Sequence, residues 1–86
     1  MSDNQEKKLY VKMASPFETY YEGEAFTVSA MNDTGPFDVL PDHANFISIL
    51  QKCTVQIFLA DRKVRIPIER GIVKVFNNNV QLFVDV

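Results

Sequence analysis

Three side chains that could take part in catalysis or metal binding lie close together in the sequence. They are Asp38, Asp42 and His43, the only histidine of the chain. Carboxylates beside an imidazole could form an acid–base pair or bind a metal ion, with the distant Cys53 as a further ligand. A catalytic imidazole also needs a nucleophile, and no Ser or Cys lies in a recognisable nucleophile motif. Acids in a proline-bounded loop are usually solvated turn formers. We therefore favour partner contact for His43 and expect no catalytic residue here.

Nucleotide and nucleic-acid chemistry have little support in the sequence. Its three glycines, at positions 23, 35 and 71, are too widely spaced to form a phosphate-binding loop, and no P-loop motif is present. The net charge of −2 lacks the basic excess that phosphate neutralisation requires. We expect no cofactor, no metal ion and no nucleic-acid partner.

Length and composition indicate one folded domain. The 86 residues are 47% hydrophobic, which is enough to fill a core. No apolar run is long enough for a membrane span, and residues 1–8 are too polar for a signal peptide. The sequence predicts a flexible leader over 1–8, followed by a folded domain over 9–86.

The sequence pattern around these residues is typical of β-strands. Val and Ile outnumber Leu and Ala, and alternation of apolar and polar residues recurs along the chain. The clearest hairpin joins 55–59 to 64–68 through Asp61-Arg62, and Pro67 indicates an edge strand or a bulge. Gly71 predicts a bend, and residues 77–79 (NNN) predict a turn. The pattern predicts an all-β fold of about nine short strands, a sandwich or a barrel.

If only one side of each strand is buried, the other side should be polar, and some large apolar residues do not fit this expectation. They fall opposite the alternating aliphatic residues of their strands: Phe58, Ile72, Phe76 and Phe83. Two interpretations remain open, because loops could cover these side chains or they could form an exposed patch that docks a partner.

Residues 35–44 (GPFDVLPDHA) resemble the G-E-F-G-V-L-P-G-H-A segment of one known family. This family is the epsilon subunit of F-type ATP synthase (delta in mitochondria), in its N-terminal β-sandwich domain. Other segments are similar to the same family and occur in the same order: Ser15-Pro16, 21–24 (YEGE), 67–75 (PIERGIVKV) and 79–85 (NVQLFVD).

The resemblance implies a flattened β-sandwich of about nine to ten short strands and a non-catalytic subunit of the central stalk, or rotor. Such a subunit docks on the gamma subunit and the c-ring and couples proton translocation to ATP synthesis, as a peripheral component at the cytoplasmic face of the membrane. The alternative is a free-standing β-sandwich adaptor with the same fold. The contact loops implied by the resemblance comprise Gly35, Pro36, Asp38, Pro41, Asp42, His43 and Ala44, with Ser15 and Ser48 as neighbours. The candidate gamma-binding patch comprises Phe58, Ile72, Phe76 and Phe83.

The sequence departs from the family motif at three loop positions. The usual glutamate is Pro36, the second glycine is Asp38, and the glycine before the histidine is Asp42. Many members continue into a C-terminal helical hairpin that inhibits the catalytic head and in some bacteria binds ATP. Because the sequence stops where that hairpin would begin, we expect no C-terminal helical hairpin and neither of its functions.

Overall fold

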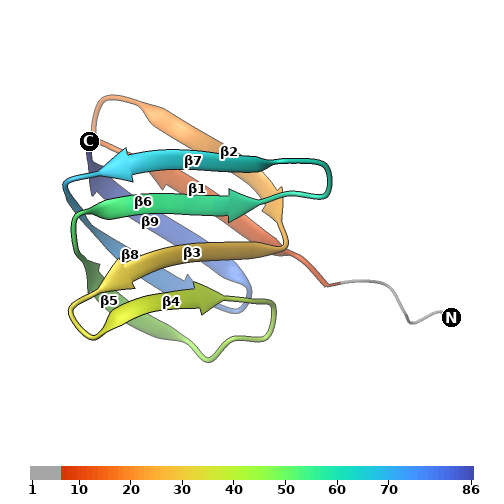
Figure 1. Cartoon of the computed structure of the whole chain (residues 1–86). Coiled ribbons are helices and arrows are strands. Elements are labelled where there is room, and N and C mark those ends of the chain that lie inside the picture. Colours follow the sequence, from red (N-terminus) through yellow and green to blue (C-terminus); the bar gives the residue numbers. More distant parts are fainter. Residues whose placement is uncertain (1–6) are drawn as a thin grey trace, which may run out of the picture.

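Nine strands make up the secondary structure of residues 7–86, the part of the chain that the computed structural model describes (Figure 1). Residues 1–6, most of the predicted leader, lie outside it. Within 7–86 there is no helix, and so none that could span a membrane. The strands are β1 (Leu9–Ala14), β2 (Thr19–Ala25), β3 (Thr27–Asn32), β4 (Gly35–Val39), β5 (Phe46–Leu50), β6 (Cys53–Phe58), β7 (Lys63–Ile68), β8 (Arg70–Phe76) and β9 (Asn79–Asp85).

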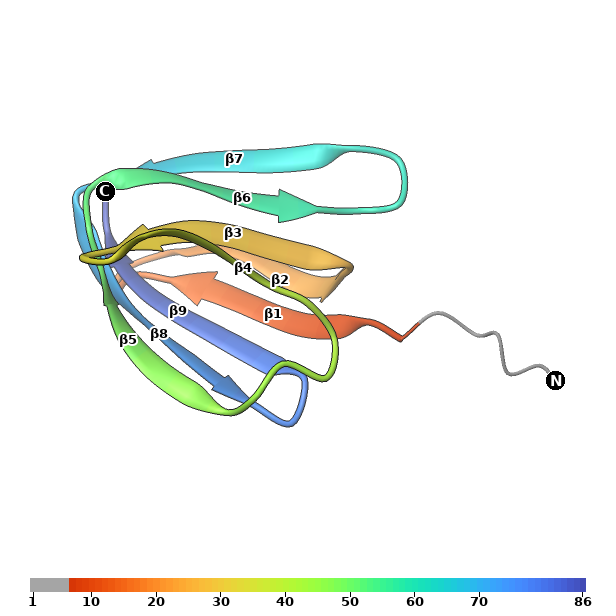
Figure 2. The ribbon, with the colours of Figure 1, turned by 60° about the horizontal axis from the view of Figure 1, so that its bottom comes forward.

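The strands form two sheets that face each other (Figures 1 and 2). One sheet has five strands in the order β2-β1-β9-β8-β5, and the other has four in the order β4-β3-β6-β7. Neighbouring strands are antiparallel except β1 and β9, which are parallel. This arrangement confirms the predicted all-β sandwich.

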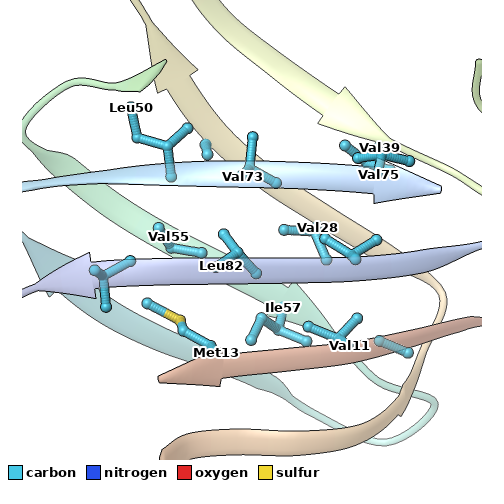
Figure 3. Packing of buried hydrophobic residues seen from close by; sticks show 14 of the residues in the cluster. Val11, Met13, Val28, Val39, Leu50, Val55, Ile57, Val73, Val75 and Leu82 are labelled. Atoms are coloured by element: carbon cyan, nitrogen blue, oxygen red, sulfur yellow. The ribbon is translucent and has the colours of Figure 1, made fainter. Parts of the chain in front are cut away.

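The core lies between the sheets and follows from the alternation of side chains along each strand. In β9, Val80, Leu82 and Val84 are buried, whereas the residues between them face outward. Figure 3 shows how side chains from both sheets meet in this layer. The core residues in the described part of the chain are all apolar, so packing is its main source of stability.

The β6–β7 hairpin agrees with the sequence prediction. Its turn is closed by a hydrogen bond from the Leu59 amide to the Arg62 carbonyl, 2.8 Å long. Pro67 lies in β7, an edge strand of the four-stranded sheet. A proline is accepted there because an edge strand does not need every backbone donor.

Gly71 does not mark a bend, so this prediction was wrong. It lies inside β8, where it pairs with Leu50 on one side and Val84 on the other. A Cβ atom at this position would stand 2.8 Å from the Phe83 carbonyl oxygen and 2.9 Å from the Val84 side chain. The glycine therefore permits close approach of β8 and β9.

The predicted turn at 77–79 is confirmed, and Asn77 and Asn78 adopt left-handed φ angles of 49° and 66°.

Adjacent residues of β9 allow a direct test of the core. Leu82 is fully buried, whereas the Phe83 side chain is 57% exposed. We expect Leu82→Ala to lower the free energy of unfolding by about 2–5 kcal/mol, because it removes buried methyl groups and leaves a cavity. Phe83→Ala, the matched control, should cost much less. Urea unfolding monitored by circular dichroism measures both changes, and equal losses would contradict the assigned orientation of β9.

Candidate partner-contact surfaces

The predicted contact loops lie at opposite ends of the sandwich. Gly35 and Pro36 begin β4, and residues 41–44 follow its end. Figure 1 shows the β3–β4 turn and the β4–β5 loop on opposite sides of the molecule. A five-residue strand is about 17 Å long, so the two segments cannot form one compact site.

The remaining predicted loop residues divide between these places. Ser15 follows β1, at the end that holds the β3–β4 turn. Ser48 lies within β5, where its hydroxyl accepts a hydrogen bond from Asn32 Nδ2 at 3.1 Å. Asp38 lies within β4 and accepts a 2.6 Å hydrogen bond from the Ser29 hydroxyl. Ser48 is thus linked to the β3–β4 end through Asn32, whereas Asp38 is held on the surface of the four-stranded sheet.

Asp42 connects the β4–β5 loop to the β8–β9 turn. Its backbone amide donates a 2.7 Å hydrogen bond to Asn78 Oδ1. The Asn77 amide donates to Asn45 Oδ1 at 2.9 Å, which is a second link between the same two segments. Both bonds use an asparagine oxygen to satisfy a backbone donor outside any strand. We call this group of four residues, Asp42, Asn45, Asn77 and Asn78, the loop clamp.

The carboxylate of Asp42 is stabilised by its neighbours. Lys7 Nζ donates to Asp42 Oδ2 at 2.8 Å, and Asn78 Nδ2 lies 3.5 Å from Oδ1. The hydrogen bond from Lys7, followed by that from Asn78, holds the pKa of Asp42 below its usual value. Asp42 has a left-handed φ of 66°, which explains why the similar family motif has glycine at this position. Aspartate is one of the few other residues that accept this conformation.

His43 is positioned by one hydrogen bond and one aromatic neighbour. Its Nδ1 lies 2.7 Å from the Ala44 carbonyl oxygen, and because a carbonyl can only accept, Nδ1 carries the proton. The ring lies 4.8 Å from the ring centre of Phe46, which in turn makes an edge-to-face contact with Phe37 at 5.9 Å. These contacts anchor the histidine where β4 and β5, from different sheets, come together.

The side chains of Asp38, Asp42 and His43 do not come together in one site. Asp38 is bonded to Ser29, Asp42 to Lys7, and His43 to its own backbone neighbour. Among residues 7–86, no group of three or more His, Cys, Asp or Glu side chains is arranged to hold a metal ion. The alternative of an acid–base or metal site, which requires these groups to meet, is therefore not supported by the geometry.

A row of apolar side chains lies on the outer side of the five-stranded sheet, next to a row that contains Lys12, Lys74 and Gln81. Ile49, Ile72 and Phe83 lie in register on the neighbouring strands β5, β8 and β9, with exposed fractions of 68%, 46% and 57%. Pro16 joins them around a shallow depression of about 430 Å³. Ile47 and Phe76 are also exposed on this side, and Lys74 lies beside Ile47 and between Ile72 and Phe76. We call this set of five residues, Ile47, Ile49, Ile72, Phe76 and Phe83, the outer apolar face.

Phe58 does not belong to this face, which corrects the predicted patch. It lies in β6 of the other sheet, where it pairs with Lys63 of β7 and is only partly exposed. Lys63 Nζ lies 5.2 Å from the centre of the Phe58 ring, a cation–π contact. Sequence reasoning instead missed Ile47 and Ile49. Their signal is the segment 46–50 (FISIL), in which the outward positions are as apolar as the inward ones.

A β-sandwich with exposed aromatic and aliphatic side chains on one sheet is typical of a domain that contacts other proteins. The family model of the ATP synthase delta/epsilon chain beta-sandwich domain matches residues 8–86, and the chain belongs to this family.

Curated relatives support the same assignment. The chain is 30% identical to an ATP synthase epsilon chain of Leptospira borgpetersenii, over 91% of its own length and 61% of the relative. It is 32% identical to an ATP synthase epsilon chain of Helicobacter pylori, over 90% of its length and 63% of the relative. The chain therefore spans about three fifths of these relatives.

Solved structures show the same fold. A chain of the Tetrahymena thermophila mitochondrial ATP synthase central stalk and c-ring matches with a TM-score of 0.80, over 94% of this chain and 66% of that chain. A chain of the Euglena gracilis mitochondrial ATP synthase matches with a TM-score of 0.84, over 98% and 55%. Sequence identity is 14% in both cases, so the likeness concerns the fold.

The ion pair of Asp42 generates a pH prediction. We expect Lys7→Ala to raise the pKa of the Asp42 carboxyl toward its usual value, because the principal stabilising hydrogen bond is removed. A folded-state pKa that is lowered favours the ionised form, so the Lys7 contact is present above the unfolded pKa and is lost as the pH falls through the folded one.

An NMR titration that follows the side-chain carboxyl carbon of Asp42 measures this pKa. Lys8→Ala is the matched control, because Lys8 pairs with Glu24 instead. An Asp42 pKa that is unchanged by Lys7→Ala, or that moves equally in both variants, would contradict the assigned contact.

Proposed function

We propose that this domain acts as a non-catalytic subunit of the central stalk of an F-type ATP synthase. In this role it docks on the gamma subunit and the c-ring and helps to couple proton translocation to ATP synthesis, at the cytoplasmic face of the membrane. The observation that carries the proposal is the family match over residues 8–86. The separate positions of Asp38, Asp42 and His43 are consistent with a role in docking instead of chemistry.

The outer apolar face is the proposed site for gamma. Aromatic side chains near the centre of an interface often supply much of the binding energy, and Phe83 lies on β9, the middle strand of the five-stranded sheet. Ile72 flanks it in register on β8. Covering these side chains removes apolar area from water, which is the main driving force for association.

The loops provide contacts of a different kind. The two ends of the sandwich are separated by the length of a strand. If the polar loops of a c-ring contact one end, they cannot also contact the other end. The loop clamp holds His43 and its neighbours in a fixed position at one end. The Gly35–Pro36 segment, which begins β4, belongs to the other end. We therefore propose that a single end meets the c-ring.

Binding to the cognate gamma subunit tests the proposal. We expect calorimetry to detect association of the unmodified domain, and Phe83→Glu to weaken it by about tenfold or more, because a charge is then buried at the interface. Ile72→Glu should act in the same direction. Phe58→Glu, on the outer side of the other sheet, is the matched control and should change the affinity little.

Circular dichroism of each variant separates lost binding from lost folding. Two results would contradict the assigned face: no association between the unmodified domain and gamma, or a loss from Phe58→Glu as large as that from Phe83→Glu.

A further inference from the structure

β5 differs from the other three edge strands of the described sandwich. Edge strands usually carry charges, prolines or bulges that prevent pairing with another chain. The other edges have such residues: Glu22 and Glu24 in β2, Pro36 and Asp38 in β4, and Lys63, Arg65 and Pro67 in β7. β5 has none of them, and residues 43–51 contain no Lys, Arg, Asp or Glu.

The register shows which backbone groups of β5 face away from its sheet. The Tyr10 amide bonds to the Asn78 carbonyl, which fixes the phase of the parallel β1–β9 ladder. Successive residues of a strand bond alternately to its two neighbouring strands. When this alternation is followed from β1 through β9 and β8, Phe46, Ser48 and Leu50 are the residues of β5 that bond to β8.

The N–H and C=O groups of Ile47 and Ile49 therefore point toward the free edge. Within residues 7–86, neither residue forms a backbone–backbone hydrogen bond outside the strand ladders. The Ile49 carbonyl receives only a long contact of 3.4 Å from the Ser48 hydroxyl. The next outward donor, the Gln51 amide, bonds to the Met31 carbonyl of β3, so the groups that a further strand can reach are those of Ile47 and Ile49.

The side chains of β5 match a second copy of the same strand. The segment 46–50 has an apolar residue at each end, isoleucine at 47 and 49, and Ser48 at its centre, so its pattern is the same in both directions. The Ile47 and Ile49 side chains are both 68% exposed on the outer face of the sheet. A twofold axis midway between the two copies of Ser48 would place Ile47 opposite Ile49 of the second copy, with the outward N–H and C=O groups of both isoleucines facing a partner.

We propose that β5 is a self-association site, at which two copies of this chain pair antiparallel about Ser48. Each Ile47 exchanges backbone hydrogen bonds with Ile49 of the second copy, and the two side chains form an apolar cross-strand pair. The two five-stranded sheets then form one continuous sheet, in which the rows of Ile49, Ile72 and Phe83 lie on the same face. The inference goes beyond the proposed docking on gamma and concerns the protein without its partners.

Sedimentation equilibrium of the purified chain over a wide concentration range tests the proposal. We expect the mean mass to rise from that of one copy toward that of two. Ile49→Pro should raise the dissociation constant by about tenfold or more, because it removes an outward donor without removing a bond to β8. Ile47→Lys should act similarly through charge on the edge. Phe83→Lys, on the outer face two strands away, is the matched control and should still dimerise.

Hydrogen exchange provides a second test that does not rely on variants. At low concentration the Ile47 and Ile49 amides should exchange quickly, whereas the Ser48 and Leu50 amides, bonded to β8, should be protected. At high concentration the two isoleucine amides should become protected as well. A protein that stays monomeric throughout, or a dimer that Phe83→Lys abolishes and Ile49→Pro and Ile47→Lys leave intact, would overturn the proposal.

Discussion

Burial of one side of each sheet against the other determines which side chains reach the surface of the sandwich. In β8 and β9 this burial fixes Val73, Val75 and Leu82 on the inside. Because side chains alternate along a strand, the same register forces Ile72 and Phe83 outward. The apolar surface of the five-stranded sheet is therefore set by the core, and a slip of one residue in β9 would exchange the two sides.

The loops are held by a different kind of interaction. The β4–β5 loop and the β8–β9 turn contain three residues in left-handed conformations, Asp42, Asn77 and Asn78. The backbone amides of Asp42 and Asn77 are satisfied by asparagine side chains and not by a sheet ladder. Polar side chains thus give order to one end of the sandwich, while apolar packing orders its middle. The outer apolar face and the loop end, the two proposed contact surfaces, are therefore ordered by different interactions.

Local patterns predicted much of the fold, because alternation and turn chemistry act over a few residues. The β6–β7 hairpin, the edge position of Pro67 and the turn at Asn77–Asn78 belong to this group. Features that depend on pairing between distant strands could not be read in this way. Phe58 has the same alternation as Phe83 but lies in the other sheet, and Gly71 needs its small size because β9 passes close to it. The link between Asp42 and Asn78 joins segments that are far apart in the sequence.

We propose that the outer side of the five-stranded sheet is the surface that a gamma subunit covers. The most direct test is photo-crosslinking in the assembled complex, with a benzoyl-phenylalanine placed at Phe83 or, in parallel, at Phe58. We expect a crosslink to gamma from position 83 and none from position 58, because these side chains lie on opposite outer surfaces of the sandwich. A crosslink to gamma from position 58 with none from position 83 would contradict it.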